Sequence, residues 1–385
     1  MPQIIAKHTS NPLVDEATNQ YYPSIRKLAK ALGIRREIIS SGLQKNGKFT
    51  YKGRSYALLK SGDNTEEPSN TTASPCEIDK DYQEYLEEKN KVKDVRELKF
   101  ETIDIRLSKH KEGSRYAIAL FSDAHIEETV HPESVQFLNE YNINIAENRI
   151  KAYFSNLVSC LNRDKIDDLI FASLGDTISG YIHDELSQTN GLSPLEAVYK
   201  AQSLIFSGLK FICENNSTLK NIKFIGIVGN HSRTTKKIQH SNGYKLSYEW
   251  LMYQNIKDKC ECAGLPIEFY IPESEMAIVN TSDGRKYIFI HGFQIKGQGT
   301  GTVCGIYPAL NRLSMKWDRV FHQNKIYLGH FHSCVSIPNA TVNGSIIGYN
   351  SYSLTNGFQC EEPAQMYEAY DTKIGELLTR KIYCK

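Results

Sequence analysis

Five short clusters of aspartate, asparagine and histidine stand out in the sequence, because each one directly follows a strongly apolar run. In chain order they are Ser122-Asp123-Ala124-His125, Leu174-Gly175-Asp176, Val228-Gly229-Asn230-His231, His291-Gly292 and Gly329-His330-Phe331-His332. Imidazole combined with carboxylate and amide oxygen is a ligand set that suits Mn²⁺, Fe or Zn²⁺, whereas carboxylates alone would favour Mg²⁺ or Ca²⁺. The five clusters therefore predict a site for divalent transition-metal ions.

The spacing within the clusters also suits coordination. Side chains two residues apart at a strand end point to the same face, so Asp123 and His125 can bind one ion. Gly329 allows the backbone to turn, so that His330 and His332 can reach different ions. A lone histidine after a strand is more often a hydrogen-bonded structural residue. Five of the eleven histidines lie in these clusters, and that concentration favours metal binding.

The elements that must position the clusters are typical of an α/β domain. Amphipathic patterns predict helices near 146–161, 195–214 and 245–258. Apolar runs predict strands at Tyr116 to Phe121, Asp168 to Leu174, Ile222 to Val228, Tyr287 to Ile290 and Lys325 to Leu328. Beyond about residue 335, Asn343-Gly344 and Asn356-Gly357 predict hairpin turns. Ligand-binding groups collect at the carboxyl ends of strands in such sheets, which is where the clusters stand.

The order of the clusters resembles the calcineurin-like metallophosphoesterase superfamily, whose signature is D-x-H, G-D, G-N-H, H and G-H-x-H. The resemblance covers about residues 115 to 360. It implies a four-layer α/β/β/α sandwich that holds two divalent metal ions, with manganese expected before iron or zinc. In this sequence it implies that Asp123, His125 and His332 hold one ion, that Asn230, His291 and His330 hold the other, and that Asp176 bridges them.

The same resemblance implies hydrolysis of a phosphate ester, in which a hydroxide that bridges the two ions attacks phosphorus in line. It places His231 beside the scissile phosphate, where the imidazolium stabilises developing charge or protonates the leaving oxygen. His231 and Asp176 are accordingly the predicted catalytic residues.

Two further positions are candidate substrate contacts. His183 belongs to the segment that follows Asp176, where the superfamily places substrate-selecting loops. Arg233, with Lys236 and Lys237, forms a basic cluster that suits a flanking phosphate. Ordinary solvation of these basic side chains is the competing interpretation.

The first sixty residues are strongly basic and carry their own pattern. Eleven lysines and arginines stand against three acidic residues, a net charge of +8, which leaves −6 for residues 61–385. Two short helical patterns meet at Gly33, and a hairpin is expected to turn at Lys52-Gly53, so the head resembles a helix-turn-helix module. Its second helix would present Arg35, Arg36, Ser40, Ser41 and Gln44 to phosphates or base edges. Docking to a protein is the alternative.

Composition divides the chain into four parts. Residues 1–60 form the basic head, 61–78 read as a flexible linker, 79–114 as a charged helix with a leading strand, and 115–385 as the catalytic domain. The apolar runs are too short to span a membrane, and no signal peptide is apparent. Nine cysteines without framework spacing predict reduced thiols in a cytoplasmic protein.

These observations favour a metal-dependent phosphodiesterase or nuclease that acts on DNA, with a DNA-repair exonuclease-like branch in view. The basic head favours DNA as the substrate, because a tethered binding module raises the local concentration of a polyanionic substrate. The alternatives are a phosphomonoesterase, acting on phosphoprotein or nucleotide with the head as a docking domain, and a nucleic-acid-binding regulator without catalysis.

Overall fold

The computed structural model describes residues 13–18, 21–22, 25–33, 38–41, 43, 48–58, 101–109, 113–295 and 306–385. The chain divides into two compact units, Met1–Glu88 and Lys89–Lys385. Each unit has an apolar core of its own. Among the described residues, no helix is both long enough and apolar enough to cross a lipid bilayer.

The N-terminal unit combines helical segments with a small antiparallel sheet. Its strand order is β2-β1-β4-β3, with β1 at Leu13–Asp15, β2 at Tyr21–Tyr22, β3 at Lys48–Tyr51 and β4 at Arg54–Leu58. Helix α1 spans Ile25–Leu32, and residues 38–41 are also helical. Leu28 from α1 and Ile39 from the second segment are buried in one core with Phe49 and Tyr56 of the sheet.

Two local predictions for this unit are confirmed. Lys52 and Gly53 form the two-residue turn between β3 and β4 with φ of 49° and 80°, as the tightest hairpin turn requires. Gly33 ends α1 with φ of 66°. Of the predicted nucleic-acid contacts, Ser40 is half-buried and Ser41 is exposed in the second helical segment, whereas Arg35, Arg36 and Gln44 lie outside the described residues. Nucleic-acid contact by the head therefore stays a prediction.

The first sheet of the larger unit has the strand order β16-β15-β6-β7-β8-β9. Strands β6 to β9 run parallel, and β15 and β16 continue the sheet as an antiparallel hairpin beside β6. The bounds are β6 Arg115–Phe121, β7 Asp168–Ser173, β8 Asn221–Gly226, β9 Ile267–Tyr270, β15 Ala364–Asp371 and β16 Gly375–Tyr383.

The second sheet has the order β13-β14-β12-β11-β10-β5 and is mixed. Its bounds are β5 Ile103–Ile105, β10 Met276–Thr281, β11 Lys286–Ile290, β12 Lys325–Leu328, β13 Val335–Ile337 and β14 Ala340–Val342. The pairs β11–β12 and β12–β14 are parallel, whereas β10–β11 and β13–β14 are antiparallel.

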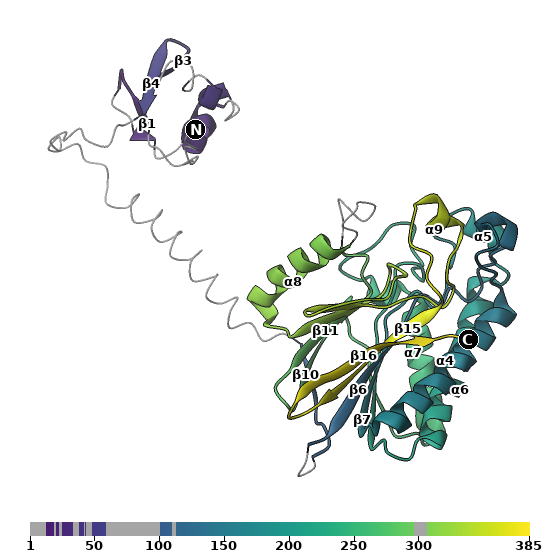
Figure 1. The fold of residues 1–385 in the computed structure, drawn as a ribbon. Helices are drawn as coiled ribbons and strands as arrows, with labels where there is room; N and C mark the ends of the chain where they lie inside the picture. Colours follow the sequence, from purple (N-terminus) through teal and green to yellow (C-terminus); the bar gives the residue numbers. More distant parts are fainter. Residues whose placement is uncertain are drawn as a thin grey trace, which may run out of the picture. The chain divides into compact units, whose positions relative to one another are not determined.

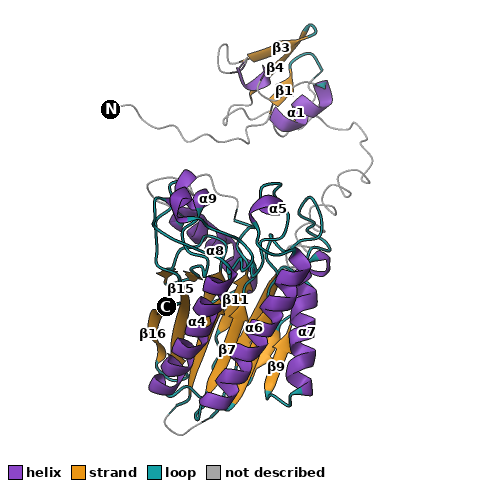
Figure 2. Cartoon of the chain, turned by 90° about the vertical axis from the view of Figure 1, so that its right-hand side faces the viewer, coloured by secondary structure: helices purple, strands orange, loops and turns teal. Residues whose placement is uncertain are grey.

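Helices cover the outer faces of both sheets (Figures 1 and 2). The long helices α4 (Ile143–Asp164), α6 (Pro194–Asn215) and α7 (Tyr248–Cys262) pack on the first sheet, and α8 (Tyr307–Phe321) packs on the second. Shorter helical turns are η1 (Pro132–Val135), α5 (Leu186–Thr189), η2 (Tyr244–Leu246) and α9 (Ser351–Thr355). The order helix, sheet, sheet, helix is the predicted four-layer α/β/β/α sandwich, which is confirmed.

Alternating side chains of strand β7 pack into two different apolar cores, one on each face of the first sheet. In β7, Leu169 and Phe171 pack against the helices, whereas Ile170 and Ala172 pack against the second sheet. Every residue of β7 is buried, which is why its sequence is a continuous apolar run rather than an alternating one.

One prediction about turns is wrong. Asn343-Gly344 and Asn356-Gly357 do not form hairpin turns: the β13–β14 hairpin turns at Pro338-Asn339, and the β15–β16 hairpin turns between Asp371 and Gly375. Asn356 instead caps the end of α9. Asn343 is fully buried and makes long-range hydrogen bonds, a role that the dipeptide pattern does not reveal.

Candidate metal centre

The five predicted clusters meet at the carboxyl ends of strands from both sheets. Asp123 and His125 follow β6, Asp176 follows β7, and Asn230 and His231 follow β8. From the second sheet, His291 comes directly after β11, and His330 and His332 follow β12. The two sheets face each other, so this edge brings together side chains that are more than 200 residues apart in the sequence.

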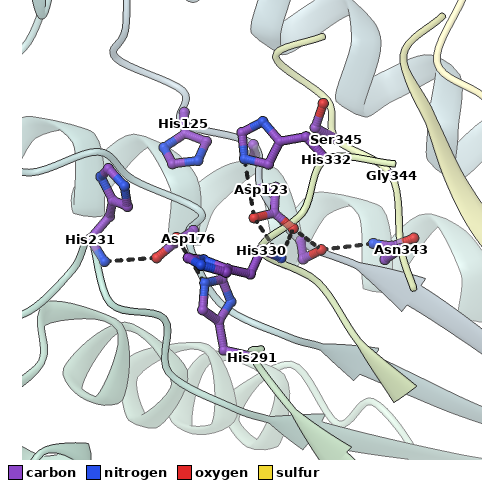
Figure 3. A network of polar contacts seen from close by, with 12 residues as sticks. Asp123, His125, Asp176, His231, His291, His330, His332, Asn343, Gly344 and Ser345 are labelled. Atoms are coloured by element: carbon purple, nitrogen blue, oxygen red, sulfur yellow. Dashed lines mark hydrogen bonds and ion pairs between the residues drawn. The ribbon is translucent and has the colours of Figure 1, made fainter. Parts of the chain in front are cut away.

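Two groups of candidate ligands form within this site (Figure 3). In the first group, Asp123, His125 and His332 bring one ligand atom each to within 4.8 Å of one another. In the second group, Asp176, His291 and His330 do the same. Asn230 joins the second group, because its Oδ1 lies 3.1 Å from His291 Nε2.

Asp176 is in contact with several members of the site. Its Oδ2 lies 2.9 Å from His291 Nε2, and its Oδ1 accepts a hydrogen bond of 2.8 Å from the backbone N–H of His231. Asp123 lies 3.4 Å from His332 Nε2 and accepts the backbone N–H of His330 at 3.0 Å. The structure thus brings together all seven predicted ligands. That Asp176 bridges two ions remains a prediction.

The backbone of the site is strained in five places. Asp123, His125, Asp176, His330 and His332 all have positive φ, between 46° and 71°, in the left-handed region that side chains other than glycine rarely adopt. Such strain persists only where the surrounding structure enforces it, and it concentrates at functional sites.

The glycines of the clusters are required by close approach. A Cβ atom on Gly229 would lie 2.0 Å from Asp176 Oδ1, and one on Gly329 would lie 2.5 Å from Asp123 Oδ2. A Cβ on Gly175 would meet the backbone nitrogen of Gly229 at 2.3 Å. Each glycine therefore makes room for a ligand or for the loop that carries one, which explains the G-D, G-N-H and G-H-x-H spacing physically.

Hydrogen bonds fix which histidine nitrogen is free to bind an ion. His291 donates from Nδ1 to the carbonyl oxygen of Leu174 at 2.7 Å. His125 Nδ1 lies 2.8 Å from Ser179 Oγ, which in turn donates to Glu128 at 3.2 Å. In both rings Nε2 is left as the ligand atom, as is usual for metal-binding imidazoles.

Lowered pKa values keep both aspartates ionised and keep two of the four ligand histidines, His125 and His330, neutral. Burial would raise the pKa of Asp176, but the positive charge of His291 outweighs it and holds that pKa well below its usual range. Burial and the charge of His231 hold the pKa of His125 well below its usual value. Burial and the charge of His291 lower the pKa of His330 to about 3.

His291 and His332 differ, because each ring lies beside a carboxylate. Burial would lower the pKa of both rings, yet Asp123 raises the pKa of His332 and Asp176 raises the pKa of His291 to about 9. A proton on His291 thus compensates a buried carboxylate, and a bound cation would take over that charge. Two ionised aspartates, four imidazoles and an amide oxygen are a donor set that fits two divalent ions.

Glu249 supports the site and was not predicted from the sequence. It is fully buried in the first turn of α7 and accepts hydrogen bonds from the backbone N–H groups of Thr177 at 2.6 Å and Gly229 at 2.7 Å. It also accepts the Ser232 hydroxyl at 2.8 Å. One carboxylate therefore holds the loops that carry Asp176, Asn230 and His231. The acidic residue in a first helical turn is a visible signal, but it does not indicate this role.

A second supporting network lies behind Asp123 (Figure 3). Ser122 Oγ donates to Asp123, and Asn343 Nδ2 donates to Ser122 Oγ at 2.8 Å and to Gln365 Oε1 at 2.7 Å. Asn343 Oδ1 accepts the backbone N–H of Met366 at 2.7 Å. Asp123 is thus held through residues that lie far along the chain, Asn343 directly after β14 and Gln365 in β15.

The predicted substrate contacts lie beside the metal centre in different settings. His183 is exposed, and its ring centroid lies 6.0 Å from that of His231. The Arg233 guanidinium donates to the backbone carbonyls of Asn230, Thr235 and Lys236, so it holds its own loop. Lys236 and Lys237 are exposed.

No protein-family model and no curated protein matches this sequence. In structure, the chain is similar to a 5'-nucleotidase from Candida albicans, at 9% identity and a TM-score of 0.33, over 74% of this chain and 54% of that one. It is similar to the sulfate thiohydrolase SoxB of Thermus thermophilus at 8% identity and a TM-score of 0.29, over 71% of this chain and 57% of that one. A serine/threonine phosphatase from Saccharomyces cerevisiae matches at 10% identity and a TM-score of 0.27, over 70% and 76%.

The chain spans about half the length of the nucleotidase and of SoxB. Similarities at these TM-scores do not assign a family or an activity.

Proposed function

We propose that the protein is a phosphoesterase that depends on two divalent metal ions. The observation that carries this proposal is the convergence of two ligand groups, in which the donor atoms of each group lie within 4.8 Å of one another. Two ions bound there would supply Lewis-acid activation of a phosphate ester and of water. Manganese is the proposed ion, with iron or zinc as alternatives, because the donors are imidazole nitrogens and hard oxygens.

His231 has a geometry that suits proton transfer. Its Nδ1 lies 3.1 Å from the carbonyl oxygen of Ser179, which can only accept, so Nδ1 carries a proton. Nε2 is then the nitrogen available to a leaving oxygen. Burial lowers the pKa of His231, and a phosphoryl anion nearby would favour the protonated ring again. In this proposal His231 assists the leaving group.

We further propose that the substrate is a phosphodiester of DNA. The support is the basic head, residues 1–60, which carries a net charge of +8. A basic module on the same chain would raise the local concentration of DNA at the metal centre. The helical segments and hairpin of that unit suit a nucleic-acid-binding role by analogy with helix-turn-helix modules.

One observation favours a second candidate, a phosphomonoesterase. The larger unit, residues 89–385, carries a net charge of only +2, so it offers little general attraction to a polyanion. A nucleotide or a phosphoprotein places fewer charges on that surface than DNA does. In this case the head would serve as a docking domain for a protein.

A panel assay separates these functions. The protein is stripped of metal, reconstituted with Mn²⁺, and assayed on duplex DNA, single-stranded DNA, RNA, bis-p-nitrophenyl phosphate and p-nitrophenyl phosphate. We expect diester hydrolysis that requires the ion, and exclusive hydrolysis of p-nitrophenyl phosphate would establish the phosphomonoesterase. Failure to bind ions or to hydrolyse any ester would contradict both, and nucleic-acid binding alone would then indicate a regulator.

Deleting residues 1–60 tests the role of the head. The KM for long DNA should rise, while hydrolysis of bis-p-nitrophenyl phosphate should stay nearly unchanged. Arg35→Ala combined with Arg36→Ala should reproduce much of this change, because phosphate contacts supply most non-specific affinity. An unchanged KM for DNA at low salt would remove the reason for preferring DNA.

A further inference from the structure

Ser179 makes hydrogen bonds to two histidines of the site, although it is not one of the predicted ligands. It follows Asp176 by three positions and is fully buried. Its hydroxyl oxygen lies 2.8 Å from His125 Nδ1, and its carbonyl oxygen lies 3.1 Å from His231 Nδ1. Both histidines are more than 50 positions away in the sequence. Ser179 thus joins a predicted ligand to the proposed proton donor.

The direction of these hydrogen bonds fixes which nitrogen of each ring carries a proton. The Ser179 hydroxyl donates its single proton to Glu128 at 3.2 Å, so it can only accept from His125 Nδ1. The carbonyl oxygen can also only accept, so His231 Nδ1 carries a proton too. Nε2 of His125 is then free for an ion, and Nε2 of His231 is available to a leaving oxygen. One residue therefore orients two rings, whose centroids lie 4.8 Å apart (Figure 3).

Two neighbouring glutamates hold Ser179 in this position. Glu127 is 1% exposed, and its Oε1 accepts the backbone N–H groups of Ser179 and Gly180, each at 2.8 Å. Its Oε2 is buried and has no hydrogen-bond partner among the described residues. Glu128, which accepts the hydroxyl, is itself fixed by Asn350 Nδ2 at 3.0 Å. The backbone and the side chain of Ser179 are therefore held separately.

We propose that Ser179 is a positioning residue that couples the first ligand group to His231, and that Glu127 holds Ser179 in place. The hydroxyl orients His125 for an ion, and the carbonyl oxygen orients His231 for a leaving oxygen. A displacement of Ser179 would therefore disturb both rings at once. A serine that only stabilised its own loop would form its bonds within that loop, whereas these bonds reach two other segments. This inference rests on the proposed function and adds a positioning residue to it.

Ser179→Ala tests the hydroxyl, because it keeps the backbone groups that contact Glu127 and His231. Affinity for Mn²⁺, measured by competition with a chelator, should fall about 10- to 100-fold. At saturating Mn²⁺, turnover of a p-nitrophenyl ester and of the matching phenyl ester should change by the same factor, because His231 keeps its partner. Ser187→Ala is the matched control, since Ser187 is exposed in the same loop and donates only to the carbonyl oxygen of Asp184.

Glu127→Ala tests the carbonyl oxygen, which no side-chain substitution removes. Without Glu127, Ser179 should no longer orient His231, so turnover of the phenyl ester should fall about tenfold more than turnover of the p-nitrophenyl ester. The poorer leaving group shows the larger loss because it needs the proton. Glu127→Gln keeps Oε1 for both backbone N–H groups and should restore the wild-type ratio of the two rates. Equal losses for both esters in a folded Glu127→Ala protein would overturn the coupling to His231.

Metal binding separates failure of this inference from failure of the proposed function. The Mn²⁺ measurement needs no turnover and does not depend on the folding of Glu127→Ala. A loss of affinity in Ser179→Ala, but not in Ser187→Ala, would support the role of the hydroxyl even if no ester is hydrolysed. Unchanged affinity in Ser179→Ala, in a protein that binds Mn²⁺ and hydrolyses an ester, would overturn the inference and leave the phosphoesterase intact. Failure of the unsubstituted protein to bind Mn²⁺ would overturn both.

Discussion

Two buried polar clusters lie at opposite ends of strand β12, and they differ in how completely their polar groups are paired. At the start of the strand, Lys325 donates to both oxygens of Glu368, at 2.8 and 2.9 Å. The same carboxylate accepts the hydroxyls of Thr341, Tyr327 and Tyr370 at 2.5 to 2.8 Å. Each of these donors has the Glu368 carboxylate as a partner, so this cluster is closed.

The metal centre follows the end of the same strand and is open. His330 is half-buried, yet its imidazole makes no hydrogen bond to any described residue, and neither does His125 Nε2. Asp123 and Asp176 are both buried, and the pKa of each lies below its usual value because neighbouring histidine charges outweigh burial. Donor atoms converge here without closing on one another.

The difference teaches how to distinguish a buried polar cluster that supports the fold from one that binds a ligand. Buried polar groups nearly always find partners, and a closed network supplies them from within the protein. An open network leaves the missing partner to be bound from solvent. The following variants test that distinction.

Asp176→Asn should have the largest effect. It keeps the volume but removes the charge on which His291 and both ligand groups depend, so turnover should fall on the order of 10³-fold, and metal content should drop. Metal stoichiometry, turnover and circular dichroism are measured on the same preparation. The control is Asp318→Asn, which removes an exposed carboxylate on α8. Two retained ions with near wild-type turnover would contradict the two-ion assignment.

His231→Asn tests whether His231 contributes to catalysis without binding an ion. We expect normal metal content and a loss of turnover of roughly 10² to 10³, the usual contribution of general acid catalysis. The loss should be smaller for p-nitrophenyl esters than for alkyl esters, because a good leaving group needs no proton. Equal losses for both would mean that His231 positions the substrate instead.

Asn343→Ala tests whether the hydrogen-bonded network behind Asp123 supports the metal centre. Asp123 would lose its support through Ser122, so affinity for Mn²⁺ should fall about 10- to 100-fold while the fold persists. Competition with a metal chelator measures the affinity. Asn356→Ala, at the exposed end of α9, is the matched control. Unchanged affinity in Asn343→Ala would show that Ser122 alone positions Asp123.

The strands and long helices of the larger unit could be predicted from the sequence because they leave local patterns. Lys325 to Leu328 was predicted as a strand with the bounds that β12 has, since a strand buried on both faces is a continuous apolar run. Helix α8 was missed, although Leu310, Leu313, Trp317 and Phe321 repeat at helical spacing. The seven ligands were predicted through their order along the chain rather than through any one motif.

The supporting residues could not be predicted, because their partners lie far away in the sequence. Glu249 binds the backbone N–H of Thr177 across 72 positions, and Asn343 binds Ser122 across 221. No spacing rule links such pairs. The Asn343-Gly344 dipeptide predicted a turn for the same reason: the local pattern was visible, and the tertiary hydrogen bonds that decide the role of Asn343 were not.

Glu368→Gln should have the smallest effect, and its pH dependence tests the closed cluster. The substitution leaves Lys325 with Glu376, 3.2 Å away, so the free energy of unfolding should fall by only about 1 to 3 kcal/mol at pH 7.

Burial would raise the pKa of Glu368, but the charge and hydrogen bonds of Lys325 outweigh it and lower that pKa. A carboxylate with a lowered pKa contributes stability above its unfolded pKa of about 4.3, and this contribution is lost as pH falls through its folded pKa. The difference between wild type and Glu368→Gln should therefore be constant above about pH 5 and shrink below it. Urea unfolding with a chelator present measures this difference, because the aspartates of the metal centre then contribute equally to both proteins and cancel. A difference that does not change with pH would mean that Glu368 acts through its shape and not through its charge.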